Sequence, residues 1–472
     1  MKIRWIFLII MTAAFLSGCT MAPKYSRPKP PVPADLPGGE PYLDVQSAME
    51  ALPLATLRWQ DLLPDKKLQK VVEIALANNR DLRLAVLNVE RARAYYGIQQ
   101  AELFPAVDLT AGGSKYLTPA DISPYKKNTY TEQYSVDLGI ASWEVDLFGR
   151  IRSLKEQALQ EYLSTEQARR GARTSLISEV ALVYLTLAAD LENLKLAQAT
   201  LEVQRSVYGV IWQQYDQGII GEPDLRRSQT QVDTASRDIA RYEQLVEQDR
   251  NALNLLAGFA VPEDLLPAGL VSISPFKDIL SDLSSNVLLR RPDILAAEHR
   301  LKASNAFIGA ARAAFFPRIS LTTALGSSSN ELAGLFGSGA KAWSFAAQTA
   351  MPIFDMRVGA AYKVSKAERD IAVAQYEKAI QTAFKEVADV LAMRGNIDQQ
   401  VDAQDSIVDS AQKVYDLSRQ RYTQGIDSYL SVLDAQRSLY LAQKELTYLR
   451  LAKQGNLVKL YAVLGGDGEW KK

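Results

Sequence analysis

A long internal repeat is the feature that most constrains this chain. The pentapeptide Tyr215-Asp216-Gln217-Gly218-Ile219 returns 207 residues later as Tyr422-Thr423-Gln424-Gly425-Ile426, each time between long segments with helical periodicity. Flanking segments match with offsets of 212 or 207 residues: Asp81-Leu82 with Asp293-Ile294, Leu103-Phe104-Pro105 with Phe315-Phe316-Pro317, and Leu256-Ala257-Gly258 with Val463-Leu464-Gly465. A unit of this length is no short solenoid repeat. The sequence therefore predicts two copies of one structural unit, with a loop of different length after Pro317.

The N-terminus has the pattern of a processing signal. Lys2 and Arg4 precede an apolar run, which is followed by Leu16-Ser17-Gly18-Cys19 and resembles a bacterial lipobox. We predict that residues 1–18 are a signal peptide and that Cys19 is lipidated and becomes the mature N-terminus; the alternative is an ordinary secretory signal with an accidental cysteine. Thr20, where some lipoproteins have Asp, resembles the sorting signal for the outer membrane. The proline-rich residues 19–58 predict an extended tether between lipid and body.

Composition excludes several classes of protein. Lysine and arginine number 54 together, as do aspartate and glutamate, so no basic patch or acidic tail is evident and nucleic acid is not a predicted partner. Cys19 is the only cysteine, which leaves none for a disulfide. After the signal, no segment has about 18 or more consecutive apolar residues. If the mature chain crosses a bilayer, we expect it to do so with strands.

Four short segments have the alternation of strands. The sequence from Trp59 to Pro105 is helical in period, and the period then changes to two. The alternating segments are residues 107–111, 134–140, 319–325 and 343–349. The strands they indicate are close to the roughly ten residues of a tilted transmembrane strand. The alternative is a small soluble sheet packed on helices.

Two much longer segments are predicted to be helical. Residues 151–216 contain no proline, and within 357–423 four apolar residues recur at intervals of seven: Val401, Val408, Tyr415 and Tyr422. That interval is the spacing of a coiled coil. Gly218 and Gly425 follow these helices and predict turns that return the chain into helices of about 35 residues.

The resulting organisation has six parts. We predict a signal peptide (1–18), a lipidated tether (19–58), repeat 1 (59–265), an equatorial linker (266–284), repeat 2 (285–465) and a C-terminal tail (466–472). Each repeat consists of a helix, a β-hairpin (about 105–148 and about 317–354), and a long helical hairpin that turns near 218–223 and 425–428. The fold class is mainly α with a transmembrane β part.

Four strands in one chain cannot form a membrane barrel. Eight strands is about the smallest closed barrel, and an open edge is not tolerated in lipid. In a cyclic oligomer, the edge strand of each chain could pair with the edge strand of the next, so that all backbone hydrogen bonds of the sheet are made. Three chains would supply twelve strands. A chain that spans the membrane is therefore predicted to be a homotrimer, with a twelve-stranded β-barrel continuous with a long α-helical periplasmic barrel.

Several motifs are long enough to be specific. They are Trp59 with Asp61-Leu62-Leu63, residues 77–82 (Ala-Asn-Asn-Arg-Asp-Leu), 289–294 (Leu-Arg-Arg-Pro-Asp-Ile), 309–317 (ending Phe-Phe-Pro) and 429–439. Together they resemble the motifs of the TolC-type outer-membrane factor family, especially its lipidated OprM-like branch. The resemblance covers almost the whole mature chain. It implies a trimeric outer-membrane exit duct of a tripartite efflux system, reached by a periplasmic adaptor (membrane fusion protein) and an inner-membrane transporter of the resistance-nodulation-division class.

The resemblance also implies where the duct is closed. It places Leu430 and Asp434 at the periplasmic gate, and because they are four residues apart they lie on one helical face. Three copies would form an apolar ring, which resists wetting, and an acidic ring, which attracts cations. The alternative is that Leu430 fills a helix seam and Asp434 faces solvent.

Further residues are implied to hold the gate closed. Asp224 is expected to meet Tyr422 or Arg437 of a neighbouring hairpin. Gly221-Glu222-Pro223 departs from the family pattern, since it is predicted to break and restart the helix, which leaves the direction of Asp224 open. The surfaces near Gly218 and Gly425 are expected to dock partner hairpins of the adaptor.

The sequence argues against catalysis. His299 is the only histidine, so no His-based metal cluster or catalytic triad can form within one chain. The acid pair Glu144 and Asp146 lies at a strand end without an obvious supporting constellation. We predict that the chain is not an enzyme and that it binds no metal and no cofactor. The covalent lipid on Cys19 is the only non-protein group expected.

Three other functions remain open at this point. A duct of the same build could export metal ions, or an unfolded protein in type I secretion. A chain of a different class would be a periplasmic coiled-coil scaffold lipoprotein with a soluble sheet.

Overall fold

The structure is a computed structural model that describes residues 20–37, 58–277 and 285–466. The signal peptide, Cys19, part of the tether, part of the linker and nearly all of the C-terminal tail lie outside the described residues. The chain divides into two compact units. Unit 1 contains Asn88–Glu166 and Ala296–Tyr376 with the chain around residues 20–29, and unit 2 contains the described parts of Pro30–Leu87, Gln167–Leu295 and Glu377–Lys472. This division is spatial and does not follow the repeats.

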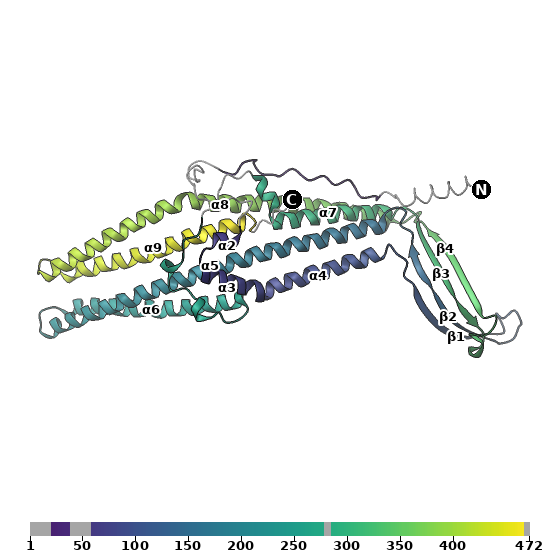
Figure 1. Cartoon of the computed structure of the whole chain (residues 1–472), viewed down its shortest axis with the longest axis horizontal. Helices are drawn as coiled ribbons and strands as arrows, with labels where there is room; N and C mark the ends of the chain where they lie inside the picture. Colours follow the sequence, from purple (N-terminus) through teal and green to yellow (C-terminus); the bar gives the residue numbers. More distant parts are fainter. Residues whose placement is uncertain (1–19, 38–57, 278–284, 467–472) are drawn as a thin grey trace. The chain divides into compact units, whose positions relative to one another are not determined.

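Unit 1 contains a four-stranded antiparallel sheet. Its strands are β1 (Asp108–Thr118), β2 (Thr129–Glu144), β3 (Arg318–Ser329) and β4 (Lys341–Ala350), in the order β1-β2-β3-β4. Strand β2 of the first hairpin pairs with β3 of the second, with a register shift between Ile140 and Trp143. The two hairpins therefore form one sheet whose edges, β1 and β4, are unpaired within the chain (Figure 1). The four segments with period-two alternation are all strands.

Helices adjoin the ends of the strands. Helix α4 (Arg80–Ala101) precedes β1, α5 (Arg150–Asp216) follows β2, α7 (Pro292–Ala313) precedes β3 and α8 (Met356–Thr423) follows β4. Ion pairs fix the junction of β2 with α5: the side chain of Arg150 donates to Glu144 at 2.8 Å, and that of Arg152 donates to Asp146 at 3.1 Å. The two acids thus have arginine partners, which gives them a structural role at this junction.

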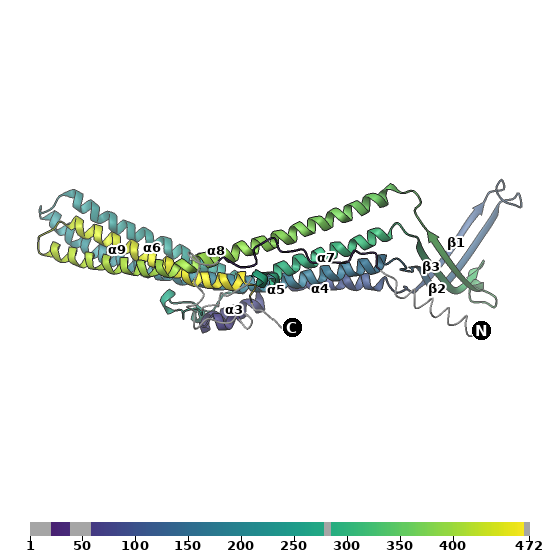
Figure 2. The same cartoon turned by 90° about the horizontal axis from the view of Figure 1, so that it is seen from above.

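Unit 2 is dominated by two helical hairpins. The second part of α5 pairs with α6 (Glu222–Ala257), and that of α8 pairs with α9 (Tyr429–Val463). In both views the two turns lie at the same end of the unit (Figures 1 and 2). Short helices complete the described chain: α2 (Trp59–Leu62), α3 (Lys66–Asn78), and the 3-10 helices Glu263–Leu265, Leu270–Ser272, Ser285–Arg290 and, in unit 1, Leu332–Gly334.

The core of unit 2 is formed where the short helices contact the hairpins. Its largest fully buried side chains include Trp59 of α2, Tyr184 of α5 and Tyr461 of α9. Arg291 donates to Asp293 of α7, to Glu386 of α8 and to the carbonyl oxygen of Val463 at the end of α9, at 2.7 to 2.8 Å. One buried guanidinium therefore joins three helix segments of this unit.

One described helix, α5, has a stretch that is long and apolar enough to cross a membrane by length and composition. Of that stretch, 56% is buried inside the protein, as expected for a core helix.

Candidate functional site

The two turns of the helical hairpins have the same backbone geometry. Gly218 and Gly425 both have φ of +71°, in the left-handed region that glycine adopts without strain. The amide of Ile219 donates to the carbonyl of Gln214 at 2.9 Å, and the amide of Ile426 donates to that of Arg421 at 3.0 Å. This is the bond from C″ to C3 in a Schellman motif. The repeated Tyr-x-Gln-Gly-Ile thus encodes a helix stop, and leaves both isoleucines exposed at the tips.

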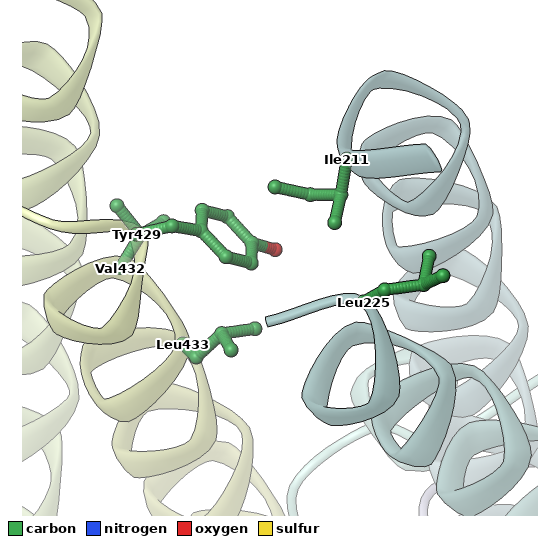
Figure 3. Packing of buried hydrophobic residues seen from close by; sticks show 5 residues of the cluster. All are labelled: Ile211, Leu225, Tyr429, Val432 and Leu433. Atoms are coloured by element: carbon green, nitrogen blue, oxygen red, sulfur yellow. The ribbon is translucent and has the colours of Figure 1, made fainter. Parts of the chain in front are cut away.

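A small apolar cluster joins the two hairpins near their turns. It consists of Ile211 of α5, Leu225 of α6, and Tyr429, Val432 and Leu433 of α9. Figure 3 shows the ring of Tyr429 pointing from α9 towards Ile211. The Tyr422 ring lies against that of Tyr429, with centroids 5.3 Å apart. The turn end of the first hairpin is therefore packed on that of the second.

The opposite face of α9 is exposed. Leu430 is 42% exposed, and Asp434 and Arg437 are exposed as well, while Val432 and Leu433 are buried. Positions 430, 434 and 437 share one helical face, and the exposed Leu441 continues it. Within one chain, neither Leu430 nor Asp434 belongs to the apolar seam. Both are available to a lumen, to solvent or to another chain.

The expected links of Asp224 are not formed within the chain. Its carboxylate pairs with Arg227 on the same helix at 3.3 Å, whereas the hydroxyl of Tyr422 donates to Gln214 at 3.4 Å. Arg437 makes no ion pair among the described residues. Gly221 is the N-cap of α6 with Pro223 in its first turn, so the helix does break and restart as predicted. A link from Asp224 to Tyr422 or Arg437 stays a prediction for contacts between chains.

A link that sequence reasoning missed joins the hairpins farther from the turns. The hydroxyl of Tyr440 on α9 donates to the buried carboxylate of Asp238 on α6 at 3.0 Å, and Arg237 donates to the other oxygen at 2.7 Å. Lys444 lies 3.8 Å from the same carboxylate. Burial alone would raise the pKa of Asp238, but the hydrogen bonds and positive charges around it lower that pKa below its usual value. A sequence signal exists: Asp238 lies in an apolar seam between the buried Ala235 and Tyr242.

Two carboxyl groups meet inside the first hairpin. Asp190 of α5 and Asp249 of α6 lie close enough for each to affect the pKa of the other. Burial and then the neighbouring charge raise the pKa of Asp249 to about 6. Burial also raises the pKa of Asp190, although the neighbouring Asp249 and then the charge of Arg241 oppose the shift. The pair makes the packing of α5 on α6 sensitive to pH.

Nothing described resembles a catalytic or metal centre. The ring nitrogen Nδ1 of His299 lies 2.7 Å from the side-chain oxygen of Gln160, and burial lowers the pKa of this histidine. Among the described residues, no group of three or more His, Cys, Asp or Glu side chains could hold a metal ion.

The fold is that of known outer-membrane channels. The structure matches that of a membrane protein from Pseudomonas aeruginosa with a TM-score of 0.87 at 38% identity, covering 96% of this chain and 99% of the other. It matches the open state of the MtrE outer membrane channel of Neisseria gonorrhoeae with a TM-score of 0.85 at 38% identity, covering 95% and 98%. A chain that combines a four-stranded antiparallel sheet with two long helical hairpins, and that matches these channels over at least 95% of its length, is a TolC-like channel protein.

The sequence comparison identifies the family. Residues 71–259 and 283–466 both match the model of the outer membrane efflux protein family, so the chain belongs to this family and acts at the outer membrane. The two matches begin 212 residues apart and end 207 residues apart, the offsets of the internal repeat. A curated relative, a probable efflux pump outer membrane protein TtgC of Pseudomonas putida, is 44% identical over 97% of this chain and 94% of its own length. The resemblance and the fold class inferred from the sequence are confirmed.

Proposed function

We propose that this efflux protein is the exit duct of a tripartite pump, a homotrimer that conducts small organic molecules passively and closes at the turn ends of its hairpins. The observation that carries the proposal is the exposed face of α9, where an apolar Leu430 and an acidic Asp434 stand side by side next to a turn. Three copies around an axis would place an apolar ring beside an acidic ring. Such a constriction blocks water and favours cations when it conducts.

The open edges of the sheet support the trimer. Strands β1 and β4 have free edges within the chain, and unpaired backbone groups cost several kcal/mol each in lipid. Pairing β1 of one chain with β4 of the next would close a ring of twelve strands. Helix α4 supports the same assembly because it has no buried residue within the chain, although it carries the exposed apolar Leu87, Tyr95 and Ile98.

The family and the hairpin tips support the proposed partners. Both turns expose an isoleucine beside the glycine, which offers apolar contact to a periplasmic adaptor near Gly218 and Gly425. The adaptor would connect the duct to an inner-membrane transporter, of the resistance-nodulation-division class. Relatives named for efflux of toluene, solvents and antibiotics favour small organic cargo over protein or metal ions. Lipidation of Cys19 would add an anchor in the outer membrane.

The same comparisons bear on the other readings of the sequence. The matched family is one of transport proteins, which supports the inference that the chain is not an enzyme. It also argues against a scaffold lipoprotein with a soluble sheet, because the matched channels cover at least 95% of this chain.

The test is the conductance of the purified full-length protein in planar bilayers, with the native mass taken from the same preparation. We expect a trimer with small cation-selective currents. Leu430→Ala should raise the conductance, and Asp434→Asn should reduce the preference for cations. The matched control is Leu441→Ala, which makes the same change on the same face of α9 about three turns away and should leave the currents unchanged.

Two results would contradict the proposal. Equal conductance of Leu430→Ala and the unchanged protein would place the constriction elsewhere. A monomer that passes no current in any variant would remove the duct altogether.

A further inference from the structure

A polar stripe on helix α7 contacts the first described residues of the chain. The stripe has intervals of four, three, four and three residues, and so lies on one face of the helix: Glu298, Lys302, Asn305, Gly309 and Arg312. All five positions contact the segment Thr20–Arg27, which we call the strap. Both the strap and these five residues belong to unit 1.

The contacts run along the strap in order. Arg312 donates to the carbonyl oxygen of Met21 at 3.2 Å, and Asn305 donates to that of Pro23 at 2.7 Å. At the other end, Arg27 donates to both oxygens of Glu298, at 3.1 and 2.5 Å. The strap therefore lies antiparallel to α7.

The length of the strap agrees with the length of the stripe on α7. Met21 and Arg27 are six residues apart, which is roughly 20 Å of extended chain. Their partners Arg312 and Glu298 are fourteen residues apart, which is about 21 Å along a helix. An extended strap can therefore keep its contacts in register over four turns of α7.

Gly309 allows the strap to approach the helix closely. A Cβ atom at this position would lie 2.6 Å from the amide nitrogen of Ala22 and 2.5 Å from the hydroxyl oxygen of Ser153 on α5. The hydroxyl oxygens of Thr20 and Ser153 lie 3.2 Å apart, which places the start of the strap on α5. The absence of a side chain at Gly309 is what leaves room for the strap backbone.

The buried carboxylate of Glu298 depends on the strap for most of its hydrogen-bond partners. Its side chain is only 3% exposed, and a buried carboxylate is costly unless it is paired and hydrogen-bonded. The hydroxyl of Tyr25 donates to it at 3.1 Å, beside the two bonds from Arg27, whereas α7 itself supplies only Lys302 at 3.0 Å. Without the strap, most of the partners of this buried charge would be missing.

We propose that the stripe on α7 is a docking site for the chain's own strap, and that docking fixes the position of Thr20, the first described residue, on unit 1. Glu298 is the positioning residue. The tether expected from the sequence is thus extended, but its first part is bound along a helix. If Cys19 carries lipid, as the proposed function holds, the anchor is attached to Thr20 near the start of α5, and the strap contacts join it to α7.

Limited trypsin digestion of the full-length protein tests the docking. The strap has one productive site, between Lys24 and Tyr25, because Arg27 and Lys29 are each followed by proline, which trypsin cleaves poorly. The probe is the release of the N-terminal peptide ending at Lys24, followed by mass spectrometry. We expect Glu298→Gln and Arg27→Gln each to speed release about tenfold or more, since each removes charge-assisted hydrogen bonds. The double variant should be little faster than either single variant, because both break the same contact.

The control is Glu368→Gln, which makes the same chemical change at an exposed position of α8 and should leave the rate unchanged. Arg27 is itself exposed, so its substitution tests the docking even if Glu298→Gln fails to fold. Release at the unchanged protein's rate in the Arg27→Gln variant would overturn the proposal. The mass of the peptide reports lipid separately, so a peptide without lipid would contradict the anchor and leave the docking result standing.

Discussion

At the scale of single residues, the turns depend on glycine for backbone reasons alone. A Cβ atom at Gly425 would meet nothing within 4 Å, yet φ of +71° strains any residue that has one. We predict that Gly425→Ala destabilises the second turn by about 1 kcal/mol. Hydrogen exchange of the amides near the turn should then be faster.

Gly209 provides the matched control for this change. It lies within helix α5 and also has open space at its Cβ position. Because its backbone is helical, Gly209→Ala should stabilise the helix by up to about 1 kcal/mol. Equal effects of the two substitutions would show that the sign of φ does not matter at Gly425.

The hydrogen bond between Tyr440 and Asp238 is expected to contribute to stability. Tyr440→Phe removes a hydrogen bond to a buried carboxylate and should cost about 1.5 to 3 kcal/mol of stability. The thermal midpoint measures this loss. When Tyr440→Phe is made in the Asp238→Asn variant, it should cost less stability than in the unchanged protein. The difference between the two costs is the coupling energy of the two side chains. Tyr448→Phe is the control because Tyr448 is exposed on the same helix; a loss as large as that of Tyr440→Phe would remove the argument for a specific link.

At the scale of helices, the acid pair in the first hairpin sets a pH dependence. The pKa of Asp249 is raised to about 6, so its protonated form is favoured in the folded state. The stability that protonation of Asp249 contributes is full below the pKa of an unfolded aspartate and is lost as the pH rises through about 6. We predict that the packing of α5 on α6 weakens as the pH rises from about 4 to about 6.

Hydrogen exchange near Asp190 and Asp249, corrected for the intrinsic effect of pH, measures this change. Asp249→Asn keeps a hydrogen-bonding side chain without the charge and should flatten the profile. Asp233→Asn, which makes the same change elsewhere on α6, should leave the profile as it is. A slope that persists in Asp249→Asn would assign the pH dependence to other groups.

The elements were predictable from the sequence because their signals are local. The alternation of apolar with polar or small residues predicted the strands, and Gly218 and Gly425 predicted the turns. Each of these patterns requires only a few neighbouring residues. Contacts between distant segments have no such signal. Asp238 and Tyr440 are 202 residues apart, and the partner of a polar residue in an apolar seam cannot be inferred from its own helix. For the same reason the strap was expected to be extended but not to be bound.

At the scale of the whole molecule, the proposed duct places the β-hairpin loops and the helical turns on opposite sides of the outer membrane. We predict that Lys127→Cys, in the loop between β1 and β2, reacts with a membrane-impermeant thiol reagent added to intact cells. Gln424→Cys, at the second helical turn, should react only after the outer membrane is permeabilised. Cys19 gives no background if it is lipidated, since it is the only native cysteine. Equal labelling of both positions in intact cells would contradict this orientation.

The pairing of β2 with β3 has a consequence for the symmetry of the proposed ring. Because these strands belong to different repeats, the proposed trimer would repeat one structural unit six times around its axis. A residue of one repeat would nevertheless occur only three times around the ring. The two helical hairpins can therefore differ in sequence: Leu430 and Asp434, proposed for the closure, follow the second turn, where the corresponding positions after the first turn are Pro223 and Arg227.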